Sequence, residues 1–282
     1  MPTVPLLLGR HQLLPDRPRL MGVLNVTPDS FSDGGLFLDA ERALDHAWAM
    51  VEEGADLIDI GGESTRPGAE PVPLDEEIRR VIPLVETLAP RLPVAVSVDT
   101  SKPDVMAAAI AAGAGMINDV TGLRDPQSRA VLAAAPTVAV CIMHMQGEPR
   151  SMQKSPVYAD VVSEIRAFFL ERLACCDGDG IDRRRVVLDP GFGFGKTVAH
   201  NYVLLRDLPE LIEIGQPVLV GLSRKSMLGR VTGRDTADRL SASVAAATLA
   251  AHAGAHLIRV HDVAATRDAM AIVQATRHGG AC

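Results

Sequence analysis

The chain has 282 residues, of which 47% are hydrophobic, and a formal net charge of -7 at neutral pH. This length allows one large core or two modest ones, and the acidic balance excludes the basic surface typical of nucleic-acid-binding proteins. No apolar run approaches the roughly 18 residues that a membrane span needs. The four cysteines lack the spacing of a disulfide framework or zinc site, and the N-terminal segment does not resemble a secretory signal. We therefore expect a cytoplasmic protein with no nucleic-acid or membrane partner.

Eight short apolar runs rich in β-branched residues recur along the chain, with segments of helical composition between them. They cover residues 20–25, 56–61, 94–99, 115–119, 138–144, 186–189, 218–222 and 257–261. This alternation predicts an α/β protein with a parallel sheet covered on its faces, and eight units match a closed (β/α)8 TIM barrel. We expect a single barrel domain over residues 19–278. An N-terminal extension, residues 1–18, either covers the bottom of the barrel or is disordered.

Each predicted strand ends in residues that can form hydrogen bonds or carry a charge. In chain order these are Asn25, Asp59 with Glu63, Asp99, Asn118 with Asp119, His144, Asp189, Arg224 with Lys225, and Arg259 with His261. A turn residue or a helix N-cap is the usual explanation for any one of them, and Asp119 and Ser101 fit that pattern. Because loops at the C-terminal ends of the strands build the site of a TIM barrel, closure would direct the whole set into one basin.

The basin would contain both acids and bases. Asp99, Asn118 and Asp189 would suit a planar heterocycle with a guanidine-like edge, since a carboxylate accepts two parallel N–H bonds. A second set of residues can hold a phosphate or carboxylate, namely Arg66, Lys225, Arg259 and His261.

The glycine-rich stretch at residues 190–197, PGFGFGKT, invites a nucleotide-binding interpretation. A Walker A motif requires four residues between its glycines, whereas three separate Gly191 from Gly195. The dinucleotide motif fails as well, because Lys196 stands where its third glycine belongs. A loop that brings Phe194 close to a flat ligand explains the stretch better.

Two single positions each allow more than one interpretation. Met143 and Met145 flank His144 and suggest a soft metal site, but no second His or Cys lies at ligand spacing, which favours apolar contact by Met143. Lys225 has the residue type of a Schiff-base lysine and equally that of a donor to a carbonyl or ring nitrogen. The sequence does not separate these two roles.

Seven segments closely resemble dihydropteroate synthases, enzymes of folate biosynthesis, over nearly the whole chain. They are MGVLNVTPDSFSDGG at 21–35, DIGGESTRPGA at 59–69, SVDTSKP at 97–103, INDVTG at 117–122, LDPGFGFGK at 188–196, GLSRKS at 221–226 and RVHDV at 259–263. The resemblance implies a transferase that joins 6-hydroxymethyl-7,8-dihydropterin diphosphate to 4-aminobenzoate, giving 7,8-dihydropteroate and pyrophosphate with Mg²⁺. It also implies a homodimer and a target of sulfonamides, which mimic 4-aminobenzoate.

The resemblance further implies a role for each matching residue. The pterin would contact Asp99, Asn118, Val120, Met143, Asp189, Gly221 and Lys225. The diphosphate would contact Asn25, Arg66, Arg259 and His261, with Asn25 also facing the magnesium ion. The 4-aminobenzoate pocket would comprise Phe31, Thr65, Arg66, Pro67, Phe194, Lys225 and Ser226. Catalysis, by a dissociative, SN1-like path, would rest on Asn25, Asp99, Lys225, Arg259 and His261. Asp59 would orient a loop without contacting the substrate itself.

Two other functions fit parts of this pattern. A pterin-binding domain that presents methyltetrahydrofolate to a corrinoid protein would need no diphosphate site, and the NVTPDSF and STRPG loops argue against it. A non-catalytic paralogue is expected to have lost one or more of Asn25, Arg66, Lys225 and His261. All four are present.

Overall fold

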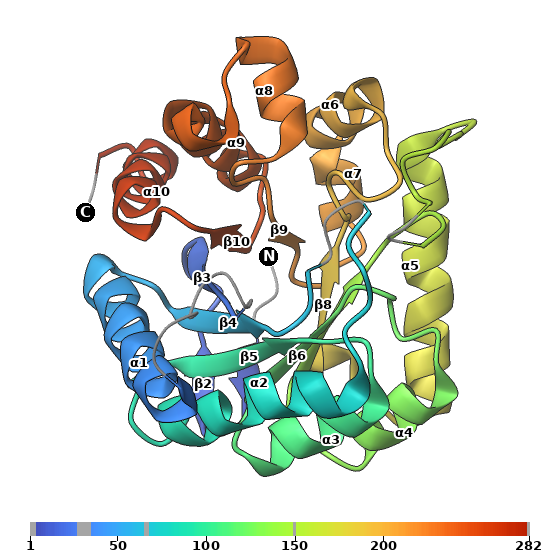
Figure 1. Cartoon of the computed structure of the whole chain (residues 1–282). Coiled ribbons are helices and arrows are strands. Elements are labelled where there is room, and N and C mark those ends of the chain that lie inside the picture. The colour runs from blue at the N-terminus through green and yellow to red at the C-terminus, as the bar shows by residue number, and fades with distance from the viewer. Residues whose placement is uncertain (1–3, 27–34, 65–67, 149–150, 281–282) are drawn as a thin grey trace.

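The computed structural model describes residues 4–26, 35–64, 68–148 and 151–280, with the backbone alone for 35–40 (Figure 1). The predicted aminobenzoate-pocket residues Phe31, Thr65, Arg66 and Pro67 lie outside the described residues, so their assignments remain predictions.

Eight parallel strands form the predicted TIM barrel. They are β3 (Arg19–Asn25), β4 (Leu57–Gly61), β5 (Ala95–Asp99), β6 (Met116–Asp119), β7 (Ala139–Met143), β8 (Val186–Asp189), β9 (Leu219–Val220) and β10 (Leu257–Val260). They pair in the order β8-β7-β6-β5-β4-β3-β10-β9. The ring closes where Leu188 bridges Val218 and its N–H donates to the Pro217 carbonyl at 2.9 Å. The predicted runs therefore match the strands closely, and the predicted fold class is confirmed.

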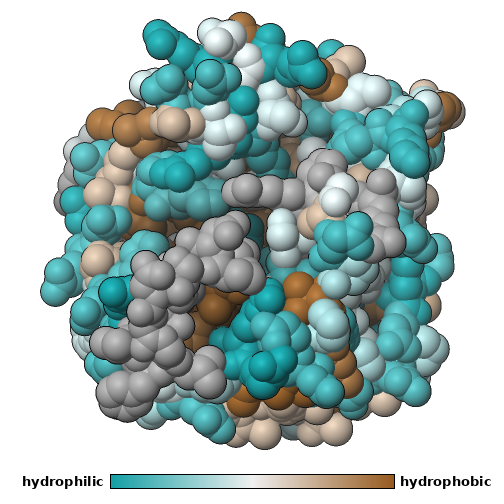
Figure 2. Space-filling view, in the orientation of Figure 1, coloured by the Kyte–Doolittle hydropathy of each residue, from teal (hydrophilic) through white to brown (hydrophobic). Residues whose placement is uncertain are grey.

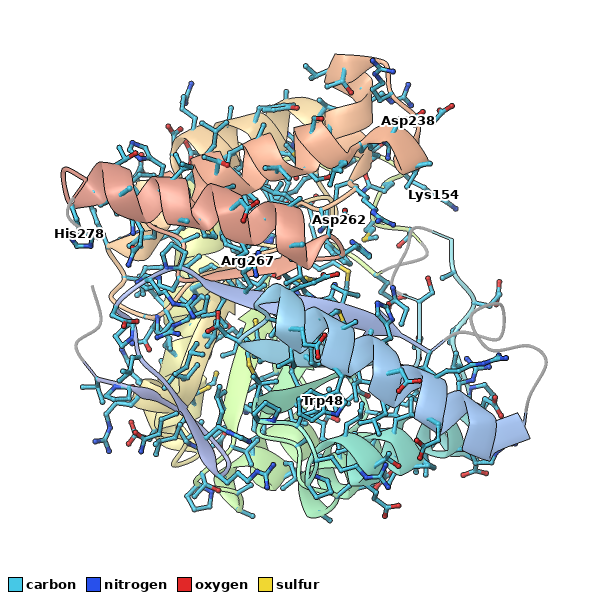
Figure 3. The ribbon with its side chains drawn as sticks, turned by 90° about the vertical axis from the view of Figure 1, so that its left-hand side faces the viewer. Trp48, Lys154, Asp238, Asp262, Arg267 and His278 are labelled. Atoms are coloured by element: carbon cyan, nitrogen blue, oxygen red, sulfur yellow. The ribbon has the colours of Figure 1, made fainter. Side chains whose placement is uncertain are left out.

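Helices surround the barrel. They are α1 (Gly35–Glu53), α2 (Leu74–Leu88), α3 (Pro103–Ala111), α4 (Pro126–Ala133), α5 (Val161–Gly178), α6 (Val198–Arg206), α7 (Leu208–Ile212), α8 (Ser226–Thr232), α9 (Leu240–His252) and α10 (Val263–Arg277). The first and last, α1 with Trp48 and α10 with Arg267, lie next to each other (Figure 3). Within the described part of the chain, no helix has the length and apolar content needed to cross a membrane.

Local sequence explains where several helices begin. The Asp125 side chain accepts a hydrogen bond from the Gln127 N–H at 2.9 Å, which caps α4. The prediction that Ser101 caps the next helix was wrong, because α3 begins at Pro103 and Lys102 occupies the cap position. Proline favours the first helical position, which sets this start one residue later than expected.

A short hairpin of β1 (Leu6–Leu8) and β2 (His11–Leu13) covers the N-terminal end of the barrel. Leu6, Leu8 and Leu13 of the hairpin join a buried cluster with residues from the barrel strands, namely Met21, Leu57, Ala95, Met116, Ala139, Cys141, Val187, Leu219 and Leu257. A Cβ on Gly115 would lie 2.5 Å from the Leu8 carbonyl oxygen, so only glycine permits this approach. The part of the extension that forms the hairpin is therefore ordered and covers the barrel bottom.

Candidate active site

Three charged side chains and one amide, from four strands, meet inside the opposite, C-terminal mouth of the barrel. Arg259 at the end of β10 donates from Nε to Asp59 Oδ2 at 2.6 Å and from Nη2 to Asp99 Oδ2 at 3.2 Å. Asn118 Nδ2 donates to the same Asp59 oxygen at 3.2 Å. Asp59 is fully buried, and Asp99 and Asn118 are nearly so. We call these four residues the arginine cluster.

Two carboxylates share one guanidinium in the arginine cluster. Burial raises the pKa of Asp99 to about 7, against the attraction of Arg259 and with added repulsion from Asp59. Burial also disfavours the charge of Arg259, but Asp59 and Asp99 outweigh it and raise the arginine pKa. N–H donors from a ligand would therefore favour the ionised form of Asp99.

A second group, formed by Asp189, Phe194 and Lys225, follows β8 and β9. Asp189 Oδ1 accepts a hydrogen bond from the Gly191 N–H at 2.8 Å. Lys225 Nζ donates to the Phe192 carbonyl and lies 4.6 Å from the centre of the Phe194 ring, within cation–π range. Burial raises the pKa of Asp189, whereas Lys225 opposes that shift. Burial lowers the pKa of Lys225 to about 8, with Asp189 opposing and Arg259 reinforcing the shift.

Two other predicted diphosphate residues that the structure describes, Asn25 and His261, lie at the same mouth. A Cβ on Gly61 would lie 3.9 Å from Asn25 Oδ1 and 3.7 Å from Asp99 Cβ, which places Asn25 beside the arginine cluster. Asn25 is exposed at the end of β3. His261 Nδ1 lies 3.0 Å from the Ser223 hydroxyl.

Apolar surface adjoins these charges. The predicted pterin contacts Val120 and Met143 are buried together in a small cluster with Met145 and Met152, and Phe194 packs against it. Gly221 lies next to Arg259, since a Cβ on this glycine would be 3.7 Å from Arg259 Cβ. Ser226 is exposed at the start of α8. The described residues predicted to bind substrate therefore lie around one end of the barrel.

Three other polar strand-end residues have different partners. Glu63 pairs with Lys102, which also pairs with Glu77. Asp119 accepts hydrogen bonds from residues of its own turn, including the Leu123 N–H at 2.9 Å, as predicted for a turn residue. Arg224 pairs with Asp262 at 2.6 Å. The expectation that all eight strand ends direct these side chains into one basin was too broad. Asp119 is satisfied by its own turn, and Glu63 and Arg224 pair with residues that follow neighbouring strands.

Two residues have larger roles than the sequence suggested. Asp59 binds both Arg259 and Asn118 and so forms the centre of the arginine cluster. Lys196 is 3% exposed and binds both His144, directly after β7, and the glycine-rich turn that follows β8. One feature of the sequence could have indicated a buried role for Lys196, namely its position directly after an apolar, glycine-rich loop.

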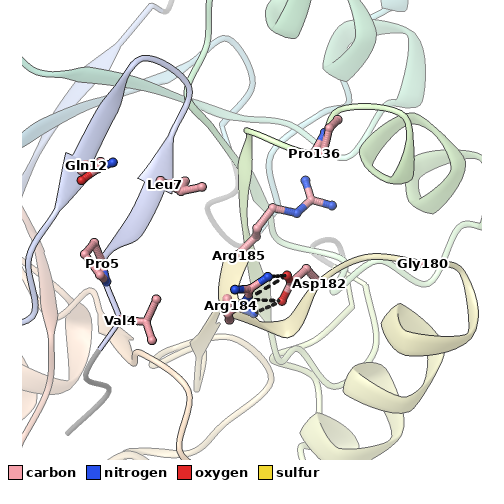
Figure 4. A pocket seen from close by; sticks show the side chains of 9 residues that line it. All are labelled: Val4, Pro5, Leu7, Gln12, Pro136, Gly180, Asp182, Arg184 and Arg185. Atoms are coloured by element: carbon pink, nitrogen blue, oxygen red, sulfur yellow. Dashed lines mark hydrogen bonds and ion pairs between the residues drawn. The ribbon is translucent and has the colours of Figure 1, made fainter.

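The larger of two described cavities lies away from this mouth. It measures about 400 Å³ and is bounded by the N-terminal hairpin and the turn at Arg183–Arg185 (Figure 4). The Arg184 side chain there pairs with Asp182, and Arg185 donates to carbonyls near the end of α4. The smaller cavity, about 270 Å³, borders the predicted aminobenzoate residue Ser226 and the turn residue Gly193.

The pKa of Lys225 predicts a pH dependence. If the charged lysine donates to the ligand, kcat/KM should fall above about pH 8, because the ammonium loses its proton there. In Lys225→Arg the cation persists to much higher pH, so the fall near pH 8 should disappear even if the maximal rate is lower. Steady-state rates across the pH range measure this. If kcat/KM of the arginine variant still falls near pH 8, a group other than Lys225 is responsible for the fall.

Comparison with known proteins agrees with the resemblance seen in the sequence. Residues 21–261 match the pterin binding enzyme family. Dihydropteroate synthase of Escherichia coli K12 is 52% identical over 260 residues, which is 92% of each chain. The Yersinia pestis dihydropteroate synthase structure with a sulfonamide drug has a TM-score of 0.92 at 50% identity and covers 98% of this chain and 100% of that chain.

A second solved structure is similar to the same degree. The Xanthomonas albilineans dihydropteroate synthase with 4-aminobenzoic acid has a TM-score of 0.90 at 53% identity and covers 97% of this chain and 98% of that chain. Such identity over full-length matches, together with the charged barrel mouth, establishes the family. The chain belongs to the pterin-binding enzymes and, within them, to the dihydropteroate synthases, which transfer a pterinylmethyl group.

Proposed function

We propose that this chain transfers the pterinylmethyl group of 6-hydroxymethyl-7,8-dihydropterin diphosphate to 4-aminobenzoate and releases pyrophosphate. The observation that carries the proposal is that the arginine cluster and the Asp189, Phe194 and Lys225 group lie at one barrel mouth. Similar Xanthomonas albilineans structures contain 4-aminobenzoic acid in one case and 7,8-dihydropteroate in another. The mouth thus offers acceptors for a pterin and cations for a diphosphate.

The pterin-binding proposal rests on unsatisfied, buried acceptors. Asn118 Oδ1 is buried and has no hydrogen-bond partner among the described residues. Leaving such an atom unpaired costs about 1–3 kcal/mol, which an N–H of the ligand would offset. Asp189 would accept from the guanidine-like edge, and Lys225 would donate to a ring nitrogen or carbonyl. The hydrogen bond from Lys225 to the Phe192 carbonyl and its proximity to Asp189 favour this donor role over a Schiff base.

The magnesium proposal rests on the type of donor at the mouth. Among the described residues, no group of three His, Cys, Asp or Glu side chains is arranged to hold a metal ion. Mg²⁺ commonly keeps several waters and binds through one or two protein oxygens together with substrate phosphates, and the exposed Asn25 amide fits that mode. When bound, Mg²⁺ would reduce the negative charge on the departing pyrophosphate.

A dissociative path follows from the weakness of an arylamine as a nucleophile. The C–O bond to the diphosphate would break first, and pyrophosphate would leave with the electron pair. Arg259 and His261 would hold this anion, while Asp99 and Asp189 would stabilise the cation at the exocyclic methylene. The amine would then attack that carbon and lose a proton. Apolar surface at Met143 and Phe194 would limit competition from water.

One assay tests the proposed reaction against its rivals. Pyrophosphate release should require the pterin diphosphate, 4-aminobenzoate and Mg²⁺ together. A methyltetrahydrofolate-presenting domain would bind the pterin ring and show no affinity for pyrophosphate. A non-catalytic paralogue would bind both substrates without turnover, and that result would overturn the proposal.

A homodimer is supported by exposed apolar residues on neighbouring C-terminal helices. Leu249 on α9 is 59% exposed and Ile272 on α10 is 65% exposed. Figure 2 shows hydrophobic side chains at the upper left, over the region where α9 and α10 adjoin. Most residues of α9 are small, and Leu249 is the most exposed large apolar side chain of this helix.

Replacing Leu249 with glutamate should convert the dimer to a monomer, because a charge in an apolar interface is costly to desolvate. Sedimentation velocity measures the change. Val157→Glu is the matched control, since Val157 is 73% exposed and lies in the segment before α5. A monomeric wild type, or equal effects of both variants, would contradict the proposed interface.

A further inference from the structure

Lys196 is buried behind the turn formed by residues 191–195. Its ammonium lies 2.9 Å from the Gly191 carbonyl, 3.1 Å from the Phe194 carbonyl and 3.1 Å from His144 Nδ1. The His144 carbonyl lies 3.4 Å away as well, so the three N–H donors of an ammonium all have acceptors within reach. Among the residues that the structure describes, its hydrogen-bond partners include no carboxylate. Lys196 therefore joins the turn to the end of β7, where His144 lies.

The His144 ring is suited to accept this hydrogen bond. Burial lowers the pKa of His144 to about 3, and Lys196 and Arg124 add to that shift. The ring is thus neutral at physiological pH and can present Nδ1 as an acceptor. It packs edge-on against Phe168 at 5.0 Å between ring centres, which fixes its orientation from the other side.

The turn itself fits closely against the end of β7. Gly191 and Gly195 both have positive φ, at 68° and 59°. A Cβ on either glycine would collide with a backbone carbonyl, that of His144 or that of Gln146. From the other side, Asn201 on α6 accepts a hydrogen bond from the Gly193 N–H at 2.7 Å. The turn is therefore held in one conformation.

The same turn makes direct contacts with the site. Its Phe192 carbonyl accepts from Lys225, and the Phe194 ring lies 4.6 Å from Lys225 Nζ. The Gly191 N–H binds Asp189 Oδ1 at 2.8 Å. A shift of the turn would change all three of these contacts together. Their geometry therefore depends on Lys196, which holds the turn in place.

We propose that Lys196 is a positioning residue that fixes the 191–195 turn so that Asp189, Phe194 and Lys225 keep the geometry needed to bind the pterin and 4-aminobenzoate. The inference rests on the proposed function. Loss of the ammonium would leave the Gly191 and Phe194 carbonyls and His144 Nδ1 without their shared donor, and the turn would relax. Small displacements at a catalytic site cost activity even where the displaced groups remain present.

The test compares Lys196→Met with Arg185→Met. Arg185 is likewise a buried basic residue, 4% exposed, that donates to backbone carbonyls, those of Leu132 at 3.1 Å and Val138 at 2.8 Å, but at the opposite end of the barrel. Both variants should have a lower midpoint of thermal unfolding. At a temperature where both are fully folded, only Lys196→Met should lose kcat/KM for 4-aminobenzoate and affinity for 7,8-dihydropteroate, each by roughly 10- to 100-fold. Pyrophosphate release and calorimetric titration, respectively, measure the two quantities.

Lys196→Gln provides a second measurement if the methionine variant does not fold. Glutamine keeps two N–H donors and no charge, so an intermediate loss of dihydropteroate affinity is expected. Wild-type affinity and kcat/KM in a folded Lys196 variant, or equal losses in Arg185→Met, would overturn the positioning role. Failure of the wild type to release pyrophosphate would instead reject the proposed function, so the two failures are distinguishable.

Discussion

Replacing Arg259 with alanine is expected to lower the free energy of unfolding by about 3–5 kcal/mol and to reduce pyrophosphate release by at least about 100-fold. The stability loss follows because Arg259 is the shared partner of the buried carboxylates of Asp59 and Asp99. The activity loss follows because the same guanidinium is proposed to hold the diphosphate. Denaturant unfolding followed by fluorescence of the single tryptophan, Trp48, measures stability.

A double variant separates these two effects of Arg259. Adding Asp59→Asn to Arg259→Ala removes one of the uncompensated buried charges, so part of the lost stability should return. Turnover should not return, because no cation has been restored to the diphosphate site. If turnover recovers together with stability, Arg259 serves only as a counter-ion. Wild-type rates in the single variant would reject its assignment altogether.

Asp189→Asn is expected to lose about 1.5–3 kcal/mol of pterin affinity, the usual contribution of a charged hydrogen bond. Its stability at neutral pH should be equal to or higher than that of the wild type. The reason is that burial raises the pKa of Asp189, so that the ionised carboxylate costs folding free energy at every pH above the unfolded-state pKa. Calorimetric titration with a pterin ligand and denaturant unfolding measure the two quantities.

Asp56→Asn is the matched control for Asp189. Asp56 lies at the opposite end of the barrel, where it accepts from Arg17 at 3.0 Å, Arg19 at 2.9 Å and the Leu20 N–H at 2.9 Å. This variant should lose stability and keep its pterin affinity. Equal affinity losses in both variants would indicate general loosening of the barrel, and unchanged binding in Asp189→Asn would contradict the proposed hydrogen bond.

The sequence predicted the barrel and much of its mouth for a simple physical reason. Parallel strands buried on both faces are mostly apolar, and a polar residue at the end of such a run marks the point where the chain leaves the core. Asp99, Asn118 and Asp189 are all last or next-to-last residues of their strands. Closure of the ring then brings together residues that are distant in the chain.

What the sequence did not predict depends on contacts across the barrel. Asp59 and Arg259 are 200 positions apart, and nothing local to either indicates that they share a hydrogen bond. The partners of Lys196 are three carbonyls and a ring nitrogen, and carbonyl groups occur at every residue of a chain. The hairpin strands β1 and β2 contain three residues each, too few for a periodic pattern.

The junction between β8 and β9 is the place where the barrel can widen most easily. Each of the other junctions in the described ring is a regular strand ladder, whereas this one is an isolated bridge beside a two-residue strand. Asp189 precedes the turn on one side of the junction and Lys225 follows β9 on the other. A bicyclic ring bound between these two residues would join the two sides of this junction and oppose its opening. The amide protons of β8 and β9 should therefore exchange with solvent more slowly when the ligand is bound than when it is absent.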